Sequence, residues 1–208
     1  MTHPVREGMP VYPGTPEVTF QKCATVENEG FAELNMTMCS HTGTHIDAPY
    51  HVLPDGKTLD QFPINKFVGP AILLDMTTKT EISLPQIEKY SEQISRAEFV
   101  VFRTGWQDKW NTSAYFEDFP TLTLGAAEWL ANFDLKAIGF DAISVDKVAD
   151  THLPKHRIFL GREILIVENL ANLDKVPQEL FEFHCLPLNI ANADGAPVRA
   201  CAFFTQLD

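Results

Sequence analysis

Four side chains that can bind a metal ion lie within eleven residues of this chain, in the run His41-Thr-Gly-Thr-His45-Ile-Asp47-Ala-Pro-Tyr-His51. Imidazole nitrogens together with a carboxylate form a ligand set that suits a divalent transition metal. The run contains no Lys or Arg that could neutralise the carboxylate, and a buried polar group without a partner is costly. The run therefore predicts a metal site. The alternative is a set of unrelated histidines with ordinary hydrogen bonds.

The residues between these side chains indicate a strand followed by a loop rather than a helix. Gly43 and Pro49 both disfavour a helix across the run. In an extended segment His45 and Asp47 point to the same side, because side chains repeat with a period of two. A bend at Gly43 can then bring His41 back beside them, and Pro49 stiffens the turn that presents the last histidine.

Length and composition favour a single domain over residues 1–208. The chain is 45% hydrophobic and 21% charged, which are values of a globular protein, and no linker, charge block or internal repeat divides it. The formal net charge of −12 argues against a nucleic acid partner, since affinity for phosphate backbones comes from clustered Lys and Arg.

Membrane and secretory segments are not expected either. No stretch approaches the roughly 18 apolar residues of a membrane span, and the first residues lack the apolar core of a secretory signal. The four cysteines are widely spaced without a C-x-x-C pair, which favours free thiols. We therefore expect a cytoplasmic protein with no membrane partner.

Apolar runs and capping residues predict a mixed α+β fold. Short apolar runs at 71–76, 99–102, 137–140 and 164–167 indicate buried interior strands. Alternating residues near 18–20 and 31–38, and the segments 180–188 and 198–204, indicate further strands. Ser83 and Thr123 are expected to begin helices, and His3 is expected in a mobile terminus. The pattern favours a barrel-like mixed β core flanked by helices.

A cluster of two or three ligands leaves metal positions to fill, and two later residues are the best candidates. His156 stands in Lys155-His-Arg-Ile-Phe-Leu, and Glu168 ends the apolar strand at 164–167, where a buried carboxylate needs a partner. Taken alone, each residue also has an interpretation without a metal: His156 as a surface residue of a helix, and Glu168 as an exposed residue at the end of a strand.

The histidine run resembles the His-x-Gly-Thr-His-x-Asp-x-Pro-x-His motif of the cyclase family of metal-dependent hydrolases, which includes bacterial kynurenine formamidases and isatin hydrolases. The resemblance extends along nearly the whole chain. It includes Tyr12-Pro-Gly, Arg103-Thr-Gly-Trp106, Gly139-Phe-Asp141-Ala-Ile-Ser-Val-Asp146, His156, Val167-Glu-Asn-Leu-Ala-Asn-Leu173 and Gly195-Ala-Pro-Val-Arg199-Ala.

By position, the resemblance implies two zinc ions. His41, His45 and Asp47 would bind one ion, and Asp47 would bridge to a second ion held by His156 and by Glu168, which also bridges. The implied fold is an α/β fold of the swivelling β/β/α type, and the implied assembly is a homodimer or a higher homo-oligomer.

The resemblance also implies that His51 is the general acid/base and that Tyr12, which stands where the formamidases carry a Trp, contacts the substrate. The implied reaction is hydrolysis of a small amide, such as an aryl formamide, a cyclic imide or a lactam, by a metal-bound hydroxide. A metal lowers the pKa of its water towards 7, and imidazole titrates near the working pH, so His51 can protonate the leaving nitrogen.

Two other functions remain open from the sequence. One is a one-metal hydrolase that opens a ring, with manganese in place of zinc, and the other is a non-catalytic metal- or ligand-binding protein. Asp141, Ser144 and Asp146 could orient ligating imidazoles or be ordinary loop residues. Arg199 could bind a substrate carboxylate or form a surface or interface ion pair.

Overall fold

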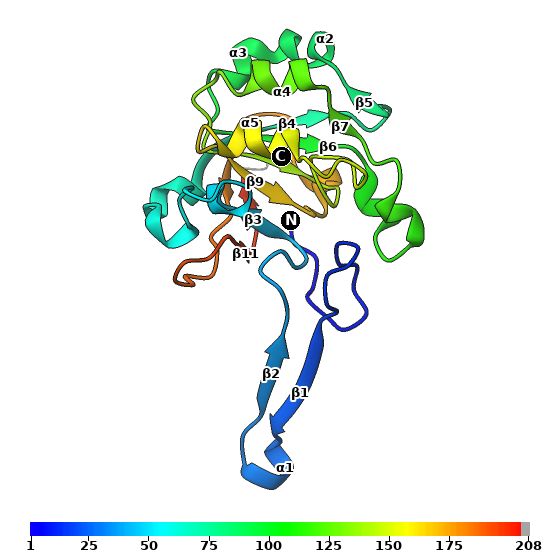
Figure 1. Cartoon of the computed structure of the whole chain (residues 1–208), viewed down its shortest axis with the longest axis vertical. Coiled ribbons are helices and arrows are strands. Elements are labelled where there is room, and N and C mark those ends of the chain that lie inside the picture. Colours follow the sequence, from blue (N-terminus) through cyan, green and yellow to red (C-terminus); the bar gives the residue numbers. More distant parts are fainter. Residues whose placement is uncertain (205–208) are drawn as a thin grey trace.

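The computed structural model describes residues 1–204, and its centre is one eight-stranded mixed β-sheet that curls into a half-barrel (Figure 1). The strand order across this sheet is β11-β3-β9-β8-β6-β4-β10-β12. The four central strands β9, β8, β6 and β4 run parallel, and the outer pairs are antiparallel. The strands are β3 (His45–Asp47), β4 (Val68–Asp75), β6 (Phe99–Arg103), β8 (Ala137–Phe140), β9 (Leu165–Glu168), β10 (Phe181–His184), β11 (Gly195–Pro197) and β12 (Cys201–Phe203).

The central strands form from the apolar runs because both of their faces are covered. On β4, Ile72 and Leu74 pack into a cluster with the helices on one face of the sheet. Ala71 and Leu73 alternate with them and pack into a second cluster inside the curl, together with Phe99 of β6. A strand with core on both sides reads as a continuous apolar run. The prediction of buried interior strands flanked by helices is confirmed.

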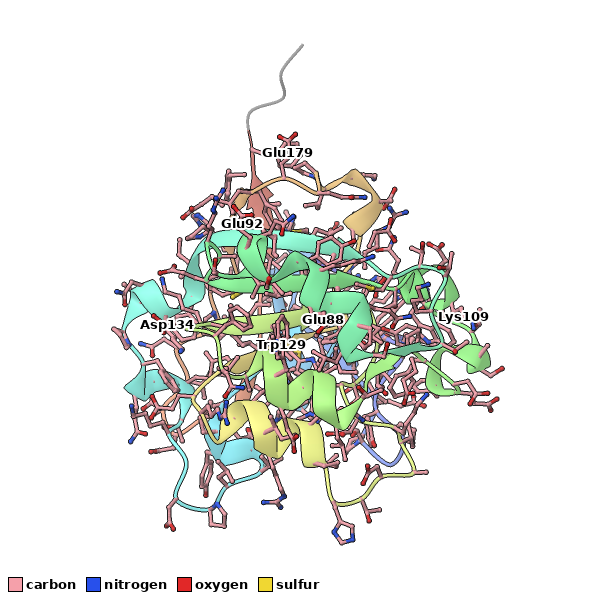
Figure 2. All side chains as sticks on the ribbon, turned by 90° about the horizontal axis from the view of Figure 1, so that it is seen from above. Glu88, Glu92, Lys109, Trp129, Asp134 and Glu179 are labelled. Carbon is pink, nitrogen blue, oxygen red and sulfur yellow. The ribbon has the colours of Figure 1, made fainter. Side chains whose placement is uncertain are left out.

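Helices cover the outer face of the sheet, as the view from above in Figure 2 shows. Thr123 begins one of them as predicted, because its hydroxyl accepts a hydrogen bond from Ala126 N at 3.2 Å. Ser83 begins another, and its backbone N–H donates to Gln86 Oε1 at 2.7 Å. That second helix is interrupted by a 3-10 turn. The elements are α2 (Leu84–Ile87), η4 (Glu88–Tyr90), α3 (Ser91–Ile94), α4 (Leu124–Leu130) and α5 (Pro154–Leu160).

A two-stranded arm stands away from the sheet at the bottom of Figure 1. It consists of β1 (Thr19–Ala24), α1 (Val26–Glu29) and β2 (Glu33–Thr37), and the two strands pair antiparallel. Both strands were predicted. Every residue of β2 is exposed, and an isolated hairpin of two strands is marginally stable in water. The arm leads directly into the histidine run.

Several short elements carry no strong sequence signal and were not predicted. They are β11, the two-stranded parallel pair β5 (Glu81–Ile82) and β7 (Thr121–Leu122), and the 3-10 turns η2 (Leu59–Gln61), η3 (Ile64–Phe67), η5 (Trp106–Lys109), η6 (Ser113–Phe116) and η7 (Leu173–Lys175). The 3-10 turn η1 (Pro49–His51) is the turn that was predicted at Pro49.

The expectation of a mobile terminus at His3 is wrong. Its backbone N–H donates to Thr44 Oγ1 at 3.0 Å, and its ring stacks on Trp110 with the ring centroids 3.9 Å apart. Thr2 forms a bridge with Leu170, so the N-terminal segment is tied to the end of β9. All four cysteines are free, as expected. Among the described residues, no helix is long and apolar enough to cross a bilayer.

Candidate active site

The histidine run folds as its spacing predicts. Gly43 has φ +64°, in the left-handed region that favours glycine, and the bend returns His41 towards β3. On β3, His45 and Asp47 lie on the same side, with His45 Nε2 3.2 Å from Asp47 Oδ1. His41 Nδ1 lies 2.7 Å from the same oxygen. Asn169 holds the bend, because its Nδ2 donates to the Gly43 carbonyl at 2.9 Å.

The two distal candidates converge on this group. Glu168 is the last residue of β9 and pairs with His45 across the antiparallel β3–β9 ladder, which leaves His45 Nε2 3.5 Å from Glu168 Oε2. His156 lies on α5 and is buried rather than a surface residue. Its Nε2 lies 3.4 Å from Glu168 Oε1 and 3.7 Å from Asp47 Oδ2. The other four predicted metal ligands thus meet around the Asp47 carboxylate.

Each of the three histidines is oriented by an acceptor on its outer nitrogen. His45 Nδ1 donates to the Gly43 carbonyl at 2.8 Å, and His156 Nδ1 donates to Asp146 Oδ2 at 2.8 Å. His41 Nε2 donates to Asp194 Oδ2 at 3.0 Å. These bonds leave the other nitrogen of each ring facing Asp47 or Glu168, and such outer partners fix the orientation of metal-binding histidines.

Asp194 and Gly195 are site residues that the sequence reasoning missed. Gly195 begins β11, directly after Asp194, and β11 pairs with β3 so that Gly195 is opposite Asp47. A Cβ atom at Gly195 would lie 2.6 Å from His41 Cε1, so glycine leaves room for the imidazole. The segment from Gly195 to Ala200 already belonged to the family resemblance, and the acidic residue directly before it was an available signal.

Protonation of histidines in this cluster offsets the negative charge of its carboxylates. Burial opposes ionisation of His41 and His156, but Asp47 and Asp194 raise the pKa of His41 to about 10, and Asp146, Glu168 and Asp47 raise that of His156 to about 10. Burial likewise opposes ionisation of Asp47, yet His45 and His41 hold its pKa well below the usual value. In the metal-free protein these shifts favour an ionised Asp47 beside protonated His41 and His156.

The donor set fits a divalent metal. Asp47 is fully buried, and its Oδ2 has no hydrogen-bond partner within residues 1–204. Three groups of three residues each offer ligand atoms that lie within 4.8 Å of one another. Two of the groups share Asp47: His41, His45 and Asp47, and Asp47, His156 and Glu168. The third is His41, His51 and Asp194. A shared, unsatisfied carboxylate oxygen among imidazole nitrogens is an arrangement that a metal cation would complete.

His51 lies beside this cluster on the turn that Pro49 begins. Its ring centroid is 4.0 Å from that of His41 and 5.6 Å from that of His156. Burial, together with the charges of His41 and His156, lowers the pKa of His51 to about 4, against an opposing effect of Asp47. His51 is thus the neutral imidazole of the site at neutral pH.

A pocket of about 220 Å³ opens onto the cluster. Its walls combine the polar cluster with apolar side chains: Tyr12, Thr15, His41, His45, His51, Ile143, Ser144, Leu153, His156, Glu168 and Asn169. Tyr12 therefore lies where a substrate residue was predicted. None of these lining residues is Lys or Arg. The pocket is small, and Tyr12, Ile143 and Leu153 add apolar surface beside the polar cluster.

The remaining sequence candidates are two buried aspartates that hold other groups, a serine that lines the pocket and an arginine outside the pocket. The buried Asp146 holds His156, and the buried Asp141 accepts hydrogen bonds from Thr104 N, Thr104 Oγ1 and Gly105 N at 2.5 to 2.9 Å. Ser144 lines the pocket. Arg199 is exposed and does not line it.

A family model described as a cyclase matches residues 1–147. A kynurenine formamidase of Bacillus anthracis is 33% identical over 202 residues, which cover 96% of this chain and 94% of that protein. This chain belongs to the cyclase family. A kynurenine formamidase of Bacillus cytotoxicus is 31% identical over 201 residues, with the same two coverages.

Solved structures share the fold. An isatin hydrolase bound to the product analogue thioisatinate matches with a TM-score of 0.84 and 25% identity, over 92% of this chain and 83% of that chain. A potential metal-dependent hydrolase with cyclase activity matches with a TM-score of 0.82 and 30% identity, over 99% and 96%. The family assignment and the mixed fold expected from the sequence are both confirmed.

We expect Asp194→Ala to weaken zinc binding by about 10- to 100-fold, the usual effect of removing the outer partner of a metal-binding histidine. The loss frees the His41 ring to rotate away from Asp47. A chelator competition titration of the metal-free protein measures the affinity directly. Asp55→Ala, which removes an exposed carboxylate from a neighbouring loop, is the control. Unchanged affinity in Asp194→Ala would contradict this role.

Metal binding should also release protons. Because the pKa values of His41 and His156 are raised to about 10, both rings are protonated at pH 7 in the metal-free protein, and a metal must displace those protons. The apparent affinity should rise about tenfold per pH unit for each displaced proton. Calorimetry between pH 6 and 8 in buffers of different ionisation enthalpy gives the proton count and the number of ions. An affinity that does not change with pH would refute the expectation.

Proposed function

We propose that this chain is a metal-dependent hydrolase of a small amide, with two zinc ions per chain and manganese as the alternative metal. The observation that supports this most is the sharing of Asp47 between two ligand groups. Two ions joined by a bridging carboxylate are a common arrangement in hydrolases. In this proposal His41, His45 and Asp47 hold one ion, and Asp47, His156 and Glu168 hold the other. The relatives named as formamidases support amide hydrolysis.

A bound metal would supply an activated water at neutral pH and polarise the amide carbonyl. The chain's own contribution to proton transfer falls to His51. It lies outside the two ligand groups of this proposal, with its ring 4.0 Å from that of His41, and a neutral imidazole there can accept the proton released when water adds to the carbonyl. The carbon–nitrogen bond then breaks, and His51 returns the proton to the leaving nitrogen.

The pocket supports a small and largely uncharged substrate. Its volume of about 220 Å³ suits a compound of about one or two rings. Tyr12, Ile143 and Leu153 provide an apolar wall. The lining contains no Lys or Arg that could pair with an anionic group of the substrate near the reacting carbonyl. We propose an aryl formamide, a cyclic imide or a lactam, with Tyr12 against the ring.

A second candidate is a one-metal hydrolase, using manganese, that opens a ring. The likeness to an isatin hydrolase, at 25% identity and a TM-score of 0.84, favours it. A non-catalytic binding protein is less well supported. A structural site gains nothing from a neutral histidine such as His51 beside the ligands.

We further propose that residues 1–208 act as one domain and assemble as a homodimer or higher homo-oligomer. The site draws on residues from 12 to 194, which supports one unit. The arm formed by β1, α1 and β2 supports assembly: Val26, Phe31, Leu34 and Met36 are each 46% to 61% exposed there, and such a patch marks a contact surface. A cytoplasmic location stays a prediction from the sequence.

His51→Ala should keep its metal and lose about 10²-fold or more in turnover of an aryl formamide, the usual scale of general acid–base catalysis. Asp47→Ala should lose metal and activity together, because it removes the shared ligand. Metal content by elemental analysis, measured beside kcat on the same samples, separates the two effects. Tyr50→Ala, which changes the exposed neighbour of His51, is the control. Equal turnover in His51→Ala and the parent would remove His51 from the mechanism.

Replacing Phe31 and Met36 by Ser should convert the oligomer into monomers, since the arm loses the apolar area that a partner would cover. Light scattering after gel filtration measures the mass. Leu124→Ser is the matched control, because Leu124 is similarly exposed on α4, away from the arm. A parent protein that is monomeric at all concentrations, or a double variant that stays oligomeric, would overturn the proposed role of the arm.

A further inference from the structure

A second cavity lies on the same edge of the sheet as the catalytic pocket. Its volume is about 690 Å³, against about 220 Å³ for the pocket at the histidine cluster, and no residue lines both. Its walls come from segments that follow three parallel strands: Thr77 and Lys79 after β4, the stretch 103–109 at the end of β6, and the stretch 172–175 after β9. The carboxyl ends of parallel strands are where ligands of open α/β sheets bind.

The lining of this cavity is cationic in an acidic protein. Lys79, Arg103, Lys109 and Lys175 line it, so four of the sixteen Lys and Arg residues of a chain with net charge −12 surround one cavity. Two carboxylates, Asp108 and Asp174, also line it.

Most of these positive charges are not neutralised by the protein. Arg103 pairs with Asp75 at 3.2 Å. Within residues 1–204, however, none of Lys79, Lys109 and Lys175 takes part in an ion pair with a carboxylate. Lys175 Nζ donates to Asn172 Oδ1 at 3.2 Å, and Lys109 lies 3.3 Å above the Trp106 ring. Four cationic side chains against two lining carboxylates, with the three ammonium groups in no direct ion pair, favour an anion in the cavity.

Hydrogen bonds connect the loops that line this cavity to one another and to the loop after β8. Asp141 binds the backbone of Thr104 and Gly105 at 2.9 and 2.8 Å. Gln107 accepts from Leu173 N at 3.1 Å and donates to Asp174 at 3.2 Å, which joins the β6 loop to the β9 loop. The Asp174 carboxylate is thus engaged by a neutral donor. The cations are therefore presented from loops that are tied to one another, with Lys109 at the rim of the molecule in Figure 2.

We propose that this cavity binds a small phosphate-bearing metabolite, at a site separate from the catalytic pocket. Several lysine ammonium groups with one guanidinium suit a multiply charged phosphate group, for which lysine serves as a point charge. The volume admits a phosphate ester with its organic part as well as free phosphate. The site needs no metal, because its own side chains supply the positive charge.

The test is a calorimetric titration of the zinc-loaded protein with inorganic phosphate and with a hexose 6-phosphate, at constant ionic strength. We expect saturable binding at one site per chain. Lys79→Gln/Lys175→Gln should weaken it about tenfold or more, since each substitution removes a charge-assisted contact with the phosphate group. Lys22→Gln/Lys89→Gln makes the same change of charge outside the cavity and should leave the affinity within about twofold.

The outcomes separate the possible sources of binding. Tighter binding of the ester than of inorganic phosphate identifies the ester as the ligand class, and equal binding identifies the phosphate group alone. Binding that disappears when zinc is removed would place the anion at the histidine cluster and overturn the proposal. Equal losses in the two double variants would reduce the effect to net charge, and an absence of saturable binding by either probe would also overturn it.

Discussion

The structure depends on the burial of one carboxylate, that of Asp47. Its side chain is fully buried on β3, and a buried charge is tolerated only when partners surround it. His41 and His45 come from the same run, whereas His156 comes from α5 across the sheet edge. The antiparallel pairing of β3 with β9 sets His45 opposite Glu168. The register of two strands therefore decides which charged groups meet, and a slip of one residue would turn Asp47 to the opposite face.

The local part of the site could be predicted from the sequence because its geometry follows from short-range rules. A period of two puts His45 and Asp47 on one side, and a glycine at φ +64° supplies the bend that returns His41. Asp194 could not be found in this way. It reaches His41 only because β11 pairs with β3, and an acidic residue before glycine is ordinary turn chemistry. His156 was a candidate from the sequence, but taken alone it also fitted a surface histidine, since its helix gives no sign by itself of which face is buried.

The same distinction applies to the fold. The interior strands were predictable because each is an apolar run of the length of a strand, covered on both faces. Strands of two or three residues, such as β5, β7 and β11, contain too few positions to show a period. The stacking of His3 on Trp110 is likewise a tertiary contact between distant segments, so the N-terminal sequence alone could not predict it. The two strands of the arm could be predicted, but nothing in the sequence indicated that the arm would extend away from the sheet.

Asp141 and Asp146 show how the edge of the sheet can carry two cavities with different linings. Both carboxylates lie in the loop after β8, yet Asp146 holds an imidazole of the catalytic cluster, whereas Asp141 binds the backbone of Thr104 and Gly105 at the cationic cavity. The two cavities share no lining residue, so each keeps its own electrostatic character. One loop nevertheless supports both, because the carboxyl ends of adjacent parallel strands open onto the same edge. Burial raises the pKa of Asp141, and the hydrogen bonds from Thr104 and Gly105 oppose that shift. The loop after β8 is therefore tied to the wall of the cationic cavity by the hydrogen bonds from Thr104 N and Gly105 N to Asp141 at 2.9 and 2.8 Å.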